Sequence, residues 1–130
     1  MAVTARRRPG LYQAACMLTD QVGDAVYIRA QANGAYKVAK CDPTTPAKMP
    51  AWGVIIQKVG FTSCVVQTEG EVRNIYTGLT PNKPYSVATN GRPIYPPQLT
   101  SGGMHQNLGV AIDVGVLYIR PADPVRLTAG

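Results

Sequence analysis

The chain has 130 residues and a net charge of +6; 45 % of its residues are hydrophobic and 15 % are charged. A chain of this length and hydrophobic content forms one packed domain, which excludes a disordered protein. The low charge, together with 13 glycines and 11 prolines, favours a turn-rich β protein over a free cytosolic enzyme.

Residues 1–10 have the composition of a basic N-terminal arm. Arg6, Arg7 and Arg8 follow one another, and no acidic residue occurs among the first nine positions. The other ten basic residues nearly balance the seven acidic ones, so the positive charge is concentrated on this arm. Pro9 and Gly10 end the arm, and no apolar stretch follows it that would make a signal peptide. We therefore expect a soluble body with an interaction arm and without a membrane-spanning segment.

Ten short segments have the composition of β-strands, and no part of the chain has sustained helical periodicity. Residues 11–18 are compatible with a strand or a helical turn, and we favour the strand. Loops are predicted at residues 41–50, with a helical turn at 46–49, and at residues 96–106. The expected strands are residues 11–18, 23–30, 35–40, 51–59, 62–68, 71–76, 85–88, 92–95, 107–112 and 115–120.

These segments predict an all-β fold, a compact antiparallel β-barrel or sandwich of about nine or ten short strands. Many short strands separated by turns that contain Gly, Pro or Asn are typical of both architectures. We expect a single β domain at residues 11–120, preceded by the extended arm and followed by a loose C-terminal tail at residues 121–130.

Two Asn-Gly pairs, Asn33-Gly34 and Asn90-Gly91, each separate two predicted strands. Asn and Gly tolerate the positive φ of tight hairpins, so both pairs predict hairpin turns. A proline-rich stretch follows each turn, and the two halves of the chain therefore share an order of landmarks. The alternative explanation is that hairpins ending in Asn-Gly are common in all proteins with short strands.

A second shared landmark is a glycine that opens an apolar segment. Gly53 lies 19 residues after the turn glycine of the first half, and Gly109 lies 18 residues after that of the second. Glycine inside a strand marks a bulge or a close backbone approach, so the same bend is expected twice. The pattern predicts two similar halves at about residues 23–68 and 81–120, aligned so that Tyr27 matches Tyr85.

No group of residues has the spacing of a catalytic, metal or cofactor site. His105 is the only histidine, and it stands in a glycine-rich segment without a serine or cysteine motif before it. Cys16, Cys41 and Cys64 lack zinc-binding spacing, and we interpret them as small, buried, unpaired thiols. We therefore expect no enzyme, no metal ion and no cofactor.

Aromatic residues are mostly tyrosines, seven against one tryptophan and one phenylalanine. Tyrosine beside Pro and Gly loops is typical of surfaces that contact other proteins. Trp52 is either a core anchor or an interface anchor, and we favour the core. Basic residues outside the arm are not interleaved with aromatic ones on one face, so we do not expect nucleic acid as a partner. A nucleic-acid-binding β-barrel remains a third hypothesis, because the arm suits phosphate binding.

Several motifs between residues 23 and 119 occur in a recognisable order: GDAVYI, DPTTPAKMPAWGV, GEVR, GLTPNKPY and LGVAI. With these motifs the chain resembles small β-rich structural domains of tailed-bacteriophage virions. Such domains occur as head decoration (cement) proteins and as modules of tail fibres and other virion-surface proteins. The cysteines and the arginine run of the arm are not part of the resemblance.

The resemblance implies a capsid decoration protein that binds the major capsid protein and stabilises the shell. It implies a homo-oligomer, with a trimer favoured, on the capsid surface of the virion after synthesis in the host cytoplasm. The alternative is a structural component of the phage tail, fibre or connector. The candidate contacts with the capsid or another partner are Arg6, Arg7, Arg8, Pro9, Tyr12, Tyr95 and His105.

Overall fold

The computed structural model describes residues 10–32, 34–99 and 101–127, and these residues form β-strands with one 3-10 turn, η2 (Pro46–Lys48). The all-β prediction is confirmed. The strands are β1 (Leu11–Ala15), β2 (Ala25–Ala32), β3 (Ala35–Lys40), β4 (Gly53–Lys58), β5 (Ser63–Gln67), β6 (Gly70–Arg73), β7 (Pro84–Val87), β8 (Pro93–Ile94), β9 (Met104–His105), β10 (Asn107–Asp113), β11 (Val116–Ile119) and β12 (Val125–Arg126).

Two of these strands lie where the sequence predicts a loop and a loose tail. β9 falls in the predicted loop at residues 96–106, and β12 falls in the predicted tail at residues 121–130. They pair with each other, with Val125 opposite His105 and Arg126 opposite Met104. A two-residue strand is too short to show alternation in the sequence, and only the pairing of distant segments creates it.

The first five strands form a closed barrel in the order β1-β3-β2-β4-β5. The prediction of wholly antiparallel pairing is wrong at one place, because β1 and β3 are parallel, with Ala14 opposite Tyr36 and Ala15 opposite Lys37. Five strands in a ring cannot all alternate in direction, so one neighbouring pair has to be parallel. In this barrel the parallel pair is β1 with β3, and the other four neighbouring pairs are antiparallel.

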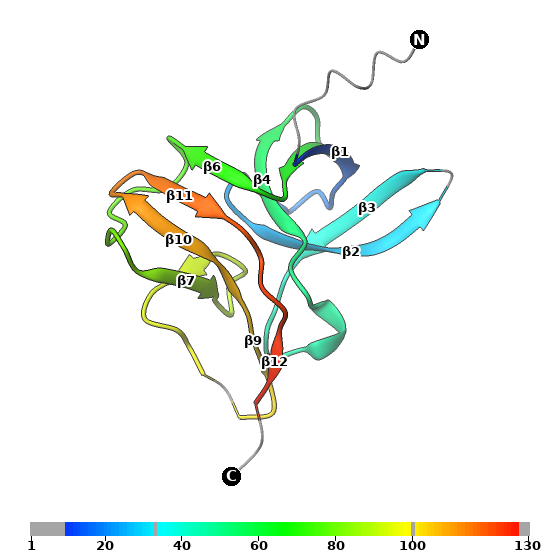
Figure 1. Cartoon of the computed structure of the whole chain (residues 1–130). Helices are drawn as coiled ribbons and strands as arrows, with labels where there is room; N and C mark the ends of the chain where they lie inside the picture. Colours follow the sequence, from blue (N-terminus) through cyan, green and yellow to red (C-terminus); the bar gives the residue numbers. More distant parts are fainter. Residues whose placement is uncertain (1–9, 33, 100, 128–130) are drawn as a thin grey trace.

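The next strands form an open antiparallel sheet, β6-β11-β10-β7-β8, which packs against the barrel (Figure 1). One core cluster fills the barrel and includes Val26 and Ile55. The larger cluster lies between barrel and sheet, and contains Val54 from the barrel with Leu108 and Leu117 from the sheet. Val54 and Ile55 are neighbours in β4 but pack into different core clusters, as expected for side chains that alternate across a strand.

The barrel and the open sheet share one strand order. β1, β2, β3, β4 and β5 occupy the places that β6, β7, β8, β10 and β11 occupy in the sheet. A bulge interrupts β4 after Ile55 and interrupts β10 after Ala111, at the corresponding point. The correspondence includes β1 and β6, which lie outside the halves expected at 23–68 and 81–120. The open sheet differs in closure, since β6 and β8 do not pair with each other.

The two strand glycines occupy equivalent close approaches of the backbone. A Cβ added to Gly53 would overlap the Gln67 carbonyl oxygen, and one added to Gly109 would overlap the Tyr118 carbonyl oxygen. Gly53 pairs with Val26, whereas Gly109 pairs with Tyr85. The register therefore matches Tyr85 with Val26, one residue from the alignment that the two tyrosines suggest.

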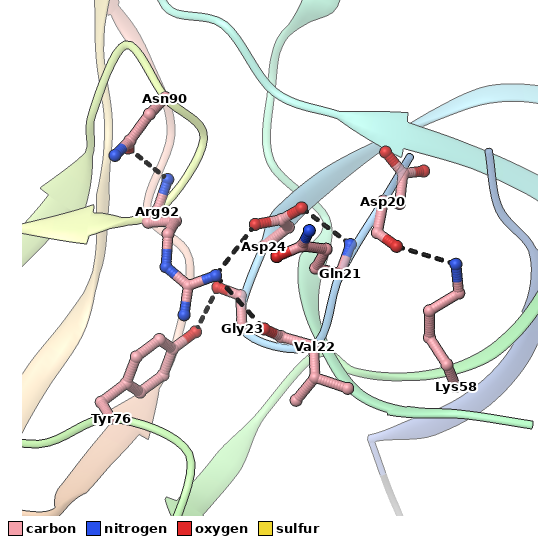
Figure 2. Close-up of polar contacts among 9 residues, drawn as sticks. All are labelled: Asp20, Gln21, Val22, Gly23, Asp24, Lys58, Tyr76, Asn90 and Arg92. Atoms are coloured by element: carbon pink, nitrogen blue, oxygen red, sulfur yellow. Dashed lines mark hydrogen bonds and ion pairs between the residues drawn. The ribbon is translucent and has the colours of Figure 1, made fainter. Parts of the chain in front are cut away.

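The side chain of Arg92 holds the loop before β2 against the open sheet (Figure 2). Its Nη1 donates to Asp24 Oδ1 at 3.2 Å and to the Val22 carbonyl oxygen at 3.2 Å. The Tyr76 hydroxyl donates to the Gly23 carbonyl oxygen at 2.7 Å. Because Asp24 is buried, its carboxylate depends on these protein partners rather than on water. We call Val22, Gly23, Asp24, Tyr76 and Arg92 the polar clamp.

The Asn90-Gly91 turn joins β7 to β8 and also contacts the barrel beside the polar clamp. Gly91 has a φ of +82°, which glycine adopts without strain, as does Gly34 (φ +77°) between β2 and β3. The Gly91 carbonyl accepts from the Ala25 amide at 2.7 Å. Asn33, the partner of Gly34 in the predicted turn, lies outside the described residues.

Candidate protein-binding site

The predicted contact residues do not gather in one place. Arg6, Arg7, Arg8 and Pro9 lie outside the described residues. Tyr12 lies in β1, Tyr95 directly follows β8, and His105 lies in β9. The strands β1, β8 and β9 belong to three different sheets, so these last three residues lie in different parts of the fold.

Tyr12 belongs to a cluster of three aromatic rings on the barrel. Its ring centroid lies 5.8 Å from that of Tyr36 and 5.0 Å from that of Trp52. The Tyr36 and Trp52 centroids are 4.7 Å apart, and all three residues are partly exposed. Tilted and edge-on ring pairs at these distances stabilise each other beyond their buried area. We call Tyr12, Tyr36 and Trp52 the aromatic cluster.

The parallel pairing of β1 and β3 brings the aromatic cluster together. Tyr12 lies two residues before Ala14, which is opposite Tyr36 in that pair. Trp52 directly precedes β4, and its amide donates to the Val26 carbonyl oxygen at 2.7 Å. Trp52 and Tyr36 also pack against the barrel core. The predicted core position of Trp52 is thus confirmed on one side of the ring, while its other side is partly exposed.

Two hollows flank Trp52 and share Pro50 and Ala51 as lining residues. One has a volume of about 290 Å³ and is also lined by Tyr27, Ile28 and Met49. The other has a volume of about 280 Å³ and reaches the prolines of the C-terminal segment, Pro121 and Pro124. Trp52 and Pro50 thus form a ridge between two hollows, a shape that suits insertion into a complementary protein surface.

A buried glutamine holds this ridge in position. Gln106 Oε1 accepts from the Ala51 amide at 2.7 Å, and its Nε2 donates to the Ala51 carbonyl at 3.1 Å. The same Nε2 donates to the Ala122 carbonyl oxygen at 2.8 Å. Gln106 therefore ties the segment before Trp52 to the C-terminal segment. Nothing local in the sequence marks it, because its partners are distant in the chain.

The described chain begins next to the aromatic cluster. Gly10 has a φ of +83°, and its carbonyl accepts from the Thr68 amide at 2.7 Å. Tyr12 is only two residues further on, so the described chain starts two residues before the first member of the aromatic cluster. The sequence predicts the arm and Tyr12 as contacts, and the structure places the rings of Tyr36 and Trp52 beside that of Tyr12.

Tyr95 and His105 lie in other surroundings. The Tyr95 and Tyr85 ring centroids are 5.9 Å apart, and Lys83 Nζ lies 5.9 Å from the Tyr95 centroid. These tyrosines line a hollow of about 390 Å³ near β8, the edge strand of the open sheet, together with Arg92 of the polar clamp. His105 is partly exposed in the short β9–β12 ribbon.

All three cysteines are buried and unpaired, as the sequence predicts. Burial raises the pKa of Cys41 well above its usual range, and the nearby charges of Asp20 and Asp42 act in the same direction. Burial and a hydrogen bond with the Cys16 thiol raise the pKa of Cys64 to about 12. Burial likewise raises the pKa of the Tyr76 hydroxyl. The folded chain therefore holds these protons more tightly than the unfolded chain does.

Stability is expected to fall as the pH rises above about 8.5, where unfolded cysteines ionise, and more steeply above about pH 10, where unfolded tyrosine ionises. Below about pH 8.5, Cys41, Cys64 and Tyr76 are protonated in both the folded and the unfolded chain, so their contribution to stability is fully present. Guanidinium unfolding at several pH values measures this dependence. Tyr76→Phe should flatten the decline above about pH 10, and an unchanged slope would contradict the assignment.

Within the described residues, no three His, Cys, Asp or Glu side chains lie close enough to hold a metal ion. No helix in the described part of the chain is long and apolar enough to cross a membrane. Comparison with protein-family models, with curated proteins and with solved structures gave no significant match.

Proposed function

We propose that this chain is a structural protein of a tailed-phage virion, a head decoration protein that binds the major capsid protein and stabilises the shell. Two independent features support the proposal. The motifs between residues 23 and 119 resemble those of virion structural domains. The surface beside the basic arm carries an aromatic cluster of the kind that anchors protein interfaces.

The aromatic cluster is the observation that carries the proposal. Tryptophan and tyrosine dominate the binding energy of protein interfaces when they sit in the middle of the contact. Here Trp52 packs on the barrel core on one side and lines two surface hollows on the other. Because Gln106 fixes the segment before it, little side-chain or backbone order has to be created on binding.

The arm supplies the second part of the contact. Arginine guanidinium groups pair with carboxylates through two parallel hydrogen bonds, so Arg6, Arg7 and Arg8 suit an acidic groove on the shell. The arm is tethered to the body at Gly10, next to the aromatic cluster. Binding by the cluster therefore raises the effective concentration of the arm at its groove, and repetition over the shell multiplies the effect.

Capsid binding tests the proposal. Trp52→Ala is expected to weaken binding to expanded empty capsids by at least about 30-fold, the loss typical of a central aromatic anchor. Deletion of residues 1–9 is expected to weaken it further and to reduce its salt dependence. Co-sedimentation over a range of protein concentrations measures both effects, with circular dichroism as the check on folding.

Leu99→Ser is the matched control, because Leu99 is an exposed apolar residue in a loop away from the aromatic cluster. It should bind like the unchanged chain. Unchanged capsid binding by folded Trp52→Ala would refute the role of the cluster. Salt-sensitive binding to single-stranded DNA without capsid affinity would favour the nucleic-acid hypothesis. A copy number per particle far below that of the major capsid protein would favour a tail, fibre or connector component.

A further inference from the structure

The outer face of the open sheet carries an exposed apolar row. Val110 of β10 pairs with Pro84 of β7 on one side and with Tyr118 of β11 on the other. Val110 is 43 % exposed and Tyr118 is 38 % exposed, although each lies within a strand that pairs with a neighbour on both sides. We call Pro84, Val110 and Tyr118 the outer row.

The barrel has an equivalent row, and it is covered. Val54 of β4 pairs with Ala25 of β2 and with Gln67 of β5, in the register of the outer row. Ala25 and Val54 are fully buried, and both belong to the core between barrel and open sheet. The row of Ala25, Val54 and Gln67 is therefore buried inside the fold, whereas the equivalent outer row on the open sheet is exposed to solvent.

A hollow of about 270 Å³ marks the outer row as a place for an apolar side chain. Besides the row itself, Asn107, Gly109 and Arg120 line it. Its walls come mainly from the paired strands β7, β10 and β11, so the hollow is preformed, as is common for binding sites. Its volume suits one large aromatic side chain better than a broad peptide.

A matching apolar tip lies at the end of the β4–β5 hairpin. Phe61, the only phenylalanine, is 82 % exposed, and Val59 is exposed beside it. The loop after β1 supplies Met17 and Leu18, which are also exposed. Exposed apolar residues in such a group are unusual on a monomeric surface and indicate a contact. We call Met17, Leu18, Val59 and Phe61 the apolar tip.

Hydrogen bonds hold the two loops of the apolar tip together. Lys58 Nζ donates to the Asp20 carbonyl at 2.8 Å and to the Leu18 carbonyl at 3.3 Å. The Cys16 amide donates to the Thr62 carbonyl oxygen at 3.0 Å. The tip is therefore a shaped surface, and Phe61 is presented in one place rather than on a free strand end.

We propose that the apolar tip of one copy docks on the outer row of a second copy, with Phe61 in the hollow beside Val110. Each chain carries both surfaces, so the contact is head to tail and generates a ring when its rotation closes. A second copy fits best because it presents a single aromatic side chain on a firm tip to a hollow of that size. The proposal does not depend on capsid binding, and it is tested without capsids.

Sedimentation of two charged variants distinguishes the modes of association. The unchanged chain should associate reversibly with rising concentration, and Phe61→Asp and Val110→Asp should each be monomeric. Their equimolar mixture should form a one-to-one dimer, because the intact tip of one variant meets the intact row of the other. Leu99→Asp, which changes an exposed apolar residue elsewhere, should associate like the unchanged chain.

The other outcomes would overturn the proposal. Association of Val110→Asp alone would indicate a tip-to-tip contact, and association of Phe61→Asp alone would indicate contact between two outer rows. A chain that stays monomeric at high concentration, with both variants folded, would show that neither surface binds a second copy. Association that starts only after removal of residues 1–9 would assign the outer row to the arm instead.

Discussion

Replacing Gly109 with alanine is expected to lower the free energy of unfolding by at least about 3 kcal/mol, a large part of the stability of a small domain. The added Cβ would overlap the Tyr118 carbonyl oxygen and lie 3.1 Å from the Ile119 Cα atom. Both are backbone atoms of the paired strand β11, so no side-chain rotation relieves the overlap. Separation of β10 from β11 would disturb the core that Leu108 and Leu117 form with the barrel.

Denaturant unfolding monitored by circular dichroism measures the effect, and the same hairpin supplies its control. At Gly115 the nearest atom to an added Cβ is the Tyr76 carbonyl oxygen at 3.8 Å, an ordinary contact. Gly115→Ala should therefore change stability by no more than about 0.5 kcal/mol. Gly53→Ala should be as harmful as Gly109→Ala, because it meets the corresponding carbonyl of Gln67. Equal stability of the Gly109 and Gly115 variants would contradict the argument.

Removal of the Arg92 side chain is expected to destabilise the chain by about 2 kcal/mol. Arg92→Ala leaves the buried Asp24 carboxylate without its charged partner, and it also removes a hydrogen bond to the Val22 carbonyl. We expect a smaller loss of stability than for a fully buried ion pair, because the Arg92 side chain is 37 % exposed to solvent.

A double substitution separates the loss of charge pairing from other effects of Arg92→Ala. Addition of Asp24→Asn removes the unpaired charge, so the double variant should lose less stability than the two single variants together. Arg73→Ala breaks the exposed ion pair with Glu71 and should change stability by less than about 0.5 kcal/mol. Strict additivity of the Arg92 and Asp24 variants would show that the clamp does not act as a charge pair.

The two proposed contacts use different parts of the molecule. The aromatic cluster lies on the barrel where the arm begins, and the outer row lies on the open sheet. A chain with one surface for a shell and another for its own copies can bind the shell as an oligomer, and its affinity then increases with the number of joined arms.

The candidate site was predictable only in part. Tyr12 follows the arginine arm directly in the sequence, and that adjacency is visible without a structure. Tyr36 and Trp52 join Tyr12 because β1 closes the barrel by parallel pairing with β3, which no local pattern indicates. The role of Gln106 could not be predicted from the sequence either, since its partner Ala51 lies 55 residues from it.

The sequence by itself determined the fold class, ten of the strands, the turns at Gly34 and Gly91 and the burial of the three cysteines. Those features depend on local alternation, on residues that tolerate positive φ and on apolar composition. Only the tertiary structure decided that the first five strands close into a barrel while the second sheet stays open. It also decided that the row at Val54 is covered while the outer row is exposed, and where the three aromatic rings meet. These depend on pairing between distant segments, and the free energy of such pairing is set by the whole fold rather than by any stretch of the chain.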